Sequence, residues 1–105
     1  MLETLRWLTE QCLDLSMDGG VPEEERKAYL AQAQQLRAAL VSLTATQFNT
    51  TTPALAQAQA QLHKVKGMLE KDEAGLKRAA EVVSQLKTLV GLLDGLVKSG
   101  ASAIV

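Results

Sequence analysis

Apolar residues recur at alternating steps of three and four along most of the chain, which is the spacing of a helix with one buried face. The run is longest in the C-terminal half, where it extends from Leu55 to Val97 with Asp72 as its one polar member. A seven-residue repeat of this length is typical of long helices that pack side by side at shallow angles. The pattern therefore predicts an all-α chain with coiled-coil-like heptad packing.

We call each such line of apolar positions a seam. The first segment has a seam at Met1, Leu5, Leu8, Cys12 and Leu15, and the middle segment at Tyr29, Ala33, Leu36, Leu40 and Leu43. The seam of the C-terminal half consists of Leu55, Ala58, Leu62, Val65, Leu69, Asp72, Leu76, Ala79, Val83, Leu86, Val90, Leu93 and Val97.

Two stretches interrupt the helical pattern. The first, 18–22, holds two glycines and a proline, residues that end one helix and begin the next. The second, 48–52, ends in three threonines ahead of Pro53, and threonine both resists helical continuation and caps a following helix. We therefore expect a single domain over 1–105 with helices at about 2–17, 23–47 and 53–98.

The third helix has a weak point near its middle. Gly75 lowers helix stability by about 1 kcal/mol relative to alanine, and Asp72 places a charge in the seam. The seam keeps one phase on both sides of this point, which favours a continuous helix about 69 Å long at about 1.5 Å per residue. The expected architecture is an elongated antiparallel helical hairpin or three-helix bundle with one long C-terminal helix. A turn near Asp72, giving a four-helix bundle, is the alternative.

The most apolar stretch is 82–97, where large side chains spread over more than one seam. A middle helix that runs back antiparallel would cover a continuous third helix only to about residue 78. Because exposing so much apolar surface is unfavourable, we expect the rest to be buried in the core of the bundle or of its homo-oligomer, or against another protein's helix. A first helix that continues in line with the middle one would cover part of it, whereas a first helix that folds back at Gly19-Gly20 would leave it for another chain. The expected protein interface consists of Val82, Leu86, Leu89, Val90, Leu92, Leu93, Leu96 and Val97.

Charge and hydropathy narrow the classes of partner. The net charge is −1, with −3 over residues 1–52 and +2 over 53–105, so no cationic surface suited to nucleic acid is expected. Lys87 and Asp94 interrupt the most apolar stretch, which argues against a transmembrane helix. Charged residues near the N-terminus argue against a signal peptide. We expect a cytoplasmic protein without nucleic-acid partners, and no membrane association as its main role.

Reactive side chains are scarce, with one cysteine and one histidine. Cys12 lies on the first seam, where a buried apolar role is expected, and His63 lies beside the seam, where solvent exposure is expected. Neither has a second histidine or cysteine at ligand spacing. We therefore expect no catalytic residues, no metal, no cofactor and no small-molecule substrate.

These observations favour a non-enzymatic helical protein that acts through protein–protein contact and self-associates through 82–97. An assembly subunit, a secretion accessory and an inhibitor or immunity protein all fit this description. A membrane-active helical component that uses residues 82–105 is the alternative. The helix–turn–helix layout around 49–53 resembles the small helical hairpins exported by bacterial type VII and type III secretion systems. Type VII members carry Trp-x-Gly in the turn, where this chain has Phe48-Asn49-Thr50, so the layout assigns no family.

Overall fold

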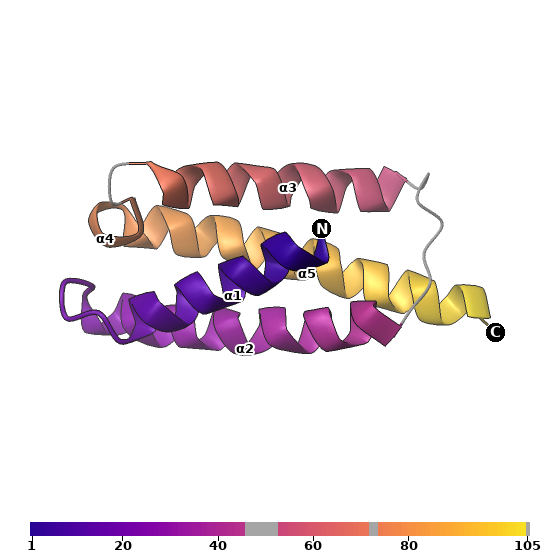
Figure 1. The fold of residues 1–105 in the computed structure, drawn as a ribbon, viewed down its shortest axis with the longest axis horizontal. Coiled ribbons are helices and arrows are strands. Elements are labelled where there is room, and N and C mark those ends of the chain that lie inside the picture. Colours follow the sequence, from indigo (N-terminus) through magenta and orange to yellow (C-terminus); the bar gives the residue numbers. More distant parts are fainter. Residues whose placement is uncertain (46–52, 72–73, 105) are drawn as a thin grey trace.

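The computed structural model describes residues 1–45, 53–71 and 74–104 of the chain. All secondary structure in these residues is helical, which confirms the predicted all-α class. The helices, shown in Figure 1, are α1 (Leu2–Ser16), α2 (Glu23–Ala45), α3 (Pro53–Glu70), the single turn α4 (Ala74–Lys77) and α5 (Ala79–Ile104).

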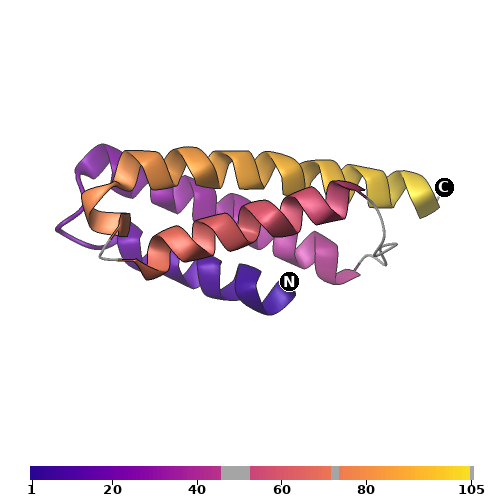
Figure 2. The same cartoon turned by 90° about the horizontal axis from the view of Figure 1, so that it is seen from above.

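Helices α2, α3 and α5 run along the length of the molecule, and α5 packs against both α2 and α3. The chain folds back between α3 and α5, so these two helices are antiparallel, whereas α5 and α2 run in the same direction (Figures 1 and 2). The shorter α1 packs chiefly on α2 and also touches α3. The described helices thus form a four-helix bundle in which α1 covers only part of the length.

The turn between α1 and α2 has the local chemistry that the sequence indicates. Asp18 organises it, because its Oδ1 accepts a hydrogen bond from the Gly20 N–H at 2.8 Å and its carbonyl accepts one from the Val21 N–H at 3.1 Å. The Pro22 carbonyl accepts a hydrogen bond from the Arg26 N–H at 2.9 Å, so proline precedes the first helical residue instead of occupying it. The second predicted loop, 48–52, lies outside the described residues.

The core lies along the inner faces of α1, α2, α3 and α5. Most seam positions of the first two segments and of α3 are buried, as the periodicity predicts. The buried members are Leu5, Leu8 and Cys12 on α1, Tyr29, Ala33, Leu36 and Leu43 on α2, and Leu55, Ala58, Leu62 and Val65 on α3. The tertiary contacts therefore use the apolar stripes that the sequence marks on these helices.

The expected continuous helix over 53–98 is wrong. Helix α3 ends at Glu70, Lys71 and Arg78 are not helical, and α5 begins at Ala79 and continues to Ile104, past the expected end. The longest dimension is 46 Å, well short of the expected helix length, and the radius of gyration is 13.8 Å. Folding back lets one chain bury the apolar face of α5 against its own α2 and α3, which a straight helix could not do in a monomer.

The buried face of α5 includes most of the expected seam, namely Ala79, Val83, Leu86 and Leu93, and is wider than that seam. The residues that lie deepest are Val82, Leu86, Leu89, Leu93 and Leu96, each at most 2% exposed. Val90 and Val97, which continue the α3 seam, are only partly buried. Because α5 packs against both α2 and α3, the core contacts a face of α5 that is broader than one seam, with its deepest residues displaced toward Leu89 and Leu96.

In the part of the chain that the structure describes, no helix combines the length and the hydropathy that spanning a bilayer requires.

Candidate functional site

The predicted interface residues of 82–97 fall into two groups in the structure. Val82, Leu86, Leu89, Leu93 and Leu96 lie in the core, covered by α2 and α3 of the same chain. The remaining three, Val90, Leu92 and Val97, are partly buried and pack against the core from its edge.

Part of the predicted interface is therefore covered within the chain, as expected if 82–97 belongs to the core of a bundle, and the physical reason is the turn after α3. The expected end of cover at about residue 78 assumed a straight third helix. Because the chain reverses between Glu70 and Ala79, α5 lies alongside α2 and α3 for most of its length (Figure 2). Whether the set also takes part in self-association is not tested by a single chain and stays a prediction.

A shallow groove of about 100 Å³ lies where α2 and α5 meet at the surface. Val90 and Val97 border it from α5, and the small residues Ala38 and Ala39 border it from α2. Asp94 also lines the groove, and its Oδ2 lies 3.0 Å from Lys98 Nζ. Gln35 and Ser42 of α2 complete the lining, so the groove holds two valines and two alanines among polar side chains, and we call the valine side of it the strip.

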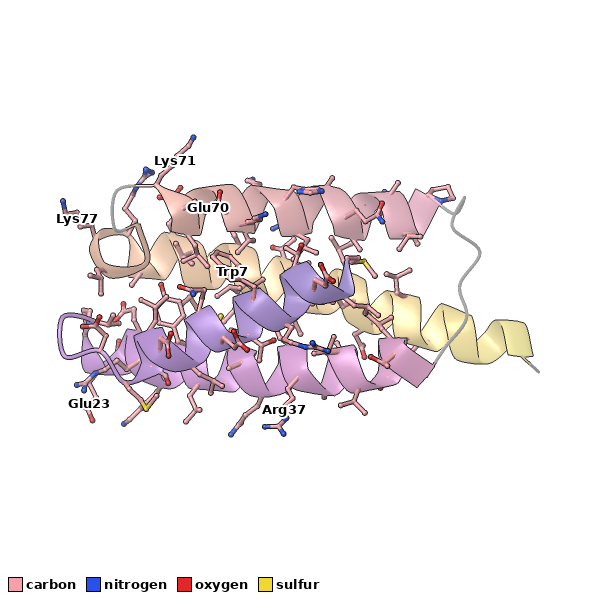
Figure 3. All side chains as sticks on the ribbon, viewed as in Figure 1. Trp7, Glu23, Arg37, Glu70, Lys71 and Lys77 are labelled. Atoms are coloured by element: carbon pink, nitrogen blue, oxygen red, sulfur yellow. The ribbon has the colours of Figure 1, made fainter. Side chains whose placement is uncertain are left out.

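A larger cleft of about 430 Å³ lies between the end of α3 and the start of α5. Three of its seven lining residues are cations, and the lining consists of His63, Lys64, Gly67, Met68, Lys71, Arg78 and Glu81. Glu81 neutralises part of this charge, because its Oε2 lies 3.5 Å from Arg78 Nη1. His63 is exposed, as the sequence predicts. Figure 3 shows the side chain of Lys71 directed away from the bundle at this end.

A third hollow, of about 320 Å³, separates α1 from α3. Trp7 of α1 and Glu70 of α3 both line it, and Figure 3 shows Trp7 between these two helices. The indole is partly buried and packs against the core. Glu70 Oε1 also lies 3.8 Å from Lys66 Nζ, an exposed pair within α3. Such exposed pairs contribute little to stability. The hollow is a surface feature of the contact between α1 and α3.

A buried hydrogen bond that the sequence did not reveal connects α2 to the region where the chain reverses. The Tyr29 hydroxyl donates to the Gly75 carbonyl of α4 at 2.8 Å. A Cβ added at Gly75 would lie 2.8 Å from Leu15 Cδ1 and 3.2 Å from Leu69 Cδ2, so the backbone of α4 sits directly against α1 and α3. The spacing of the apolar residues places Tyr29 on a seam, and Gly75 is a weak point in the helical pattern. No local feature of the sequence indicates that these two residues form a hydrogen bond.

Burial determines the protonation of two groups in this region. It raises the pKa of the Cys12 thiol to about 12, and it raises the pKa of Tyr29 above its ordinary value, with Cys12 and Glu25 adding to the effect on Tyr29. Both side chains are therefore protonated at neutral pH. Cys12 is fully buried, as the sequence predicts.

The described parts of the chain bring no three His, Cys, Asp or Glu side chains together in a way that could hold a metal ion. Comparison of the chain with protein-family models, with curated proteins and with solved structures gives no match.

Proposed function

We propose that this chain is a non-enzymatic helical protein that acts by binding protein chains, and that two copies associate through the flank of α5 that carries Val90 and Val97. The observation that carries the proposal is the position of these two valines. They lie seven residues apart on one face, remain only partly buried, and border a groove whose other wall includes Ala38 and Ala39. This strip holds two of the three predicted interface residues that stay partly exposed, the third being Leu92.

The arrangement of polar groups around the strip supports a protein partner. Asp94 and Lys98 form an ion pair beside the valines, and Gln35 and Ser42 of α2 also line the groove, so its apolar side chains are flanked by polar and charged ones. Stable protein interfaces have this organisation. A second copy is the partner that the proposal names, because a contact about a two-fold axis uses one patch twice and needs no second complementary surface.

The raised pKa values of Cys12 and Tyr29 support a role without catalysis. Cys12 and Tyr29 are buried, and the raised pKa of each keeps it protonated, whereas a nucleophilic thiol needs a lowered pKa and access to substrate. Neither residue lines one of the three hollows described above.

The test compares two double variants by circular dichroism and by sedimentation equilibrium over a wide concentration range. Val90→Glu with Val97→Glu places charge on the partly exposed strip, so the variant should stay folded and lose the dimer. The matched control, Leu89→Glu with Leu96→Glu, places two carboxylates in the core and should lose its cooperative unfolding transition.

The proposal fails if the strip variant and the wild type have the same mass at every concentration. Co-sedimentation of the wild type with neutral and anionic phospholipid vesicles, abolished by the strip variant, would instead support the membrane-active alternative for 82–105.

A further inference from the structure

We infer that the hollow between α1 and α3 binds an arginine side chain that a partner protein presents. The guanidinium stacks on the indole of Trp7, and the carboxylates of Glu3 and Glu70 supply the negative charge that holds it. The strip proposed for self-association lies on α5 beside α2, so this site is separate from it and the inference does not depend on the dimer.

The hollow is a gap in the packing of α1 against the bundle. Helix α1 packs chiefly on α2 and only touches α3. A volume of about 320 Å³ stays open between α1 and α3, lined by Glu3, Thr4 and Trp7 of α1 and by Lys66 and Glu70 of α3. Sites for small ligands begin at about 300 Å³, so the hollow has room for one long side chain.

The one tryptophan of the chain lines this hollow and is not enclosed in the core. Trp7 is only partly buried, packs against the core, and lies between α1 and α3 in Figure 3. Tryptophan contributes strongly to protein recognition, because its rigid ring offers a large contact area and loses little entropy on binding. The face of an indole also attracts cations more strongly than the face of any other aromatic side chain. Trp7 therefore favours a flat cationic group as the ligand.

The charges around the hollow favour a cation as well. Glu3 is exposed and forms no ion pair within the described part of the chain. Glu70 pairs with Lys66, whose Nζ lies 3.8 Å from Glu70 Oε1, and both side chains of this pair are well exposed. An exposed pair at this distance contributes little, so a ligand can take the place of Lys66. The lining carries two negative charges against one positive charge.

Arginine matches this hollow better than lysine does. The planar guanidinium can lie flat on an indole while its N–H groups donate to a carboxylate, whereas an ammonium is a compact and strongly hydrated charge. The source is a side chain of a partner protein and not free arginine, because Glu3 and Glu70 would repel the α-carboxylate of the free amino acid. An arginine within a polypeptide carries no such charge.

Trp7 reports binding directly, because its fluorescence is the only tryptophan signal of the chain. The probe is N-acetyl-arginine amide, and its matched control is N-acetyl-citrulline amide, which has a similar shape and no charge. The arginine compound should change the fluorescence of Trp7 saturably, with a dissociation constant of about 1 mM for a ligand this small. The citrulline compound should give no saturable change. Equal responses to the two compounds overturn the inference.

Two further ligands test the choice of arginine and its source. N-acetyl-lysine amide should bind more weakly than the arginine compound, and equal affinity overturns the assignment to arginine. Free L-arginine should also bind more weakly, because its α-carboxylate enters an acidic hollow. Tighter binding of free L-arginine overturns the assignment to a partner protein.

Removing the two carboxylates should weaken binding. Glu3→Gln with Glu70→Gln keeps the size of both side chains, and the dissociation constant for the arginine compound should rise by about fivefold or more. The matched control, Glu10→Gln with Asp14→Asn, removes the same charge from exposed positions of α1 that do not line the hollow. It should bind as the wild type does at about 0.15 M salt, where charges act over about 8 Å. Equal losses in both variants overturn the inference.

Removing the competing lysine should strengthen binding. Lys66→Gln frees Glu70 and deletes the positive charge in the hollow, so the dissociation constant should fall by about twofold or more. The matched control is Lys64→Gln, which makes the same charge change at an exposed position of α3 outside this hollow and should leave the constant unchanged. A purely structural role of the Lys66–Glu70 pair predicts no gain, and the absence of a gain overturns the inference.

Circular dichroism checks that each variant is folded, which we expect because Glu3, Lys66 and Glu70 are exposed or partly exposed. Salt dependence tests the wild type without any substitution. Raising the salt from about 0.02 M to about 0.5 M screens the attraction between guanidinium and carboxylates, so the dissociation constant for the arginine compound should rise several-fold. An unchanged constant overturns the inference, including where a variant does not fold.

Discussion

Replacing Leu89 by alanine should destabilise the fold much more than replacing its neighbour Val90. The two residues are adjacent on α5 but occupy different environments, because Leu89 is fully buried and Val90 is partly buried at the edge of the α2–α5 groove. The pair therefore tests the phase in which α5 packs.

The size of the effect follows from what each substitution removes. Leu89→Ala deletes a buried branched side chain and leaves a cavity, a change that costs about 2–5 kcal/mol. Val90→Ala removes less apolar volume from a site that water already reaches, so about 1 kcal/mol is expected. A domain of this size has a total stability of about 5–15 kcal/mol, so the first loss is a large fraction of it.

Urea unfolding followed by circular dichroism, at a protein concentration low enough to keep the chain monomeric, measures both losses. With a slope of about 1–3 kcal/mol per molar urea, the midpoint should fall by about 1–3 M for Leu89→Ala and by under about 1 M for Val90→Ala. Equal losses, or a larger loss for Val90→Ala, would mean that α5 packs in the phase of the α3 seam and that the folded-back hairpin is wrong.

Two further predictions concern the core. Burial raises the pKa values of Cys12 and Tyr29, so the unfolded chain loses these protons at lower pH than the folded chain. The free energy of unfolding should therefore keep their whole contribution below about pH 8 and decrease as the pH rises through the unfolded-state pKa values. Urea midpoints measured from pH 7 to pH 11 should show this decline, with a smaller decline in Cys12→Ala, and a flat profile would contradict it. On α3, Leu62→Ala should lower the free energy of unfolding by about 2–5 kcal/mol, and substitution of its exposed neighbour, His63→Ala, by no more than about 0.5 kcal/mol. Thermal unfolding measures both losses, and similar losses would mean that the α3 seam is misplaced.

The helical class and most of the inward faces are local properties, and the sequence predicts them well. The C-terminal end of α1 and the start of α2 follow from the glycines and proline of 18–22, whose backbone preferences act within a few residues. The burial of Cys12 and the exposure of His63 follow from their positions relative to the seams. These features depend on spacing along one helix, which a sequence displays directly.

The break after Glu70 depends on contacts that no local pattern records. Gly75 and Asp72 weaken the helix by amounts that one long seam could offset, so the sequence favours continuity. The fold is decided by residues far away along the chain: Tyr29 donates to the Gly75 carbonyl, Leu15 fills the space beside it, and the reversal buries α5. Such contacts form only once the helices are packed together.

The same reasoning explains why 82–97 was expected to be an interface. A heptad stripe shows that a helix needs a partner, but the free energy of burying it is nearly the same whether that partner belongs to the same chain or to another. The tertiary structure assigns Leu89 and its buried neighbours to the chain's own α2 and α3, and leaves Val90 and Val97 at the edge. The sequence by itself therefore determined that α5 is covered, and only the tertiary structure decided by what, because the turn that brings the cover into place is held by non-local contacts.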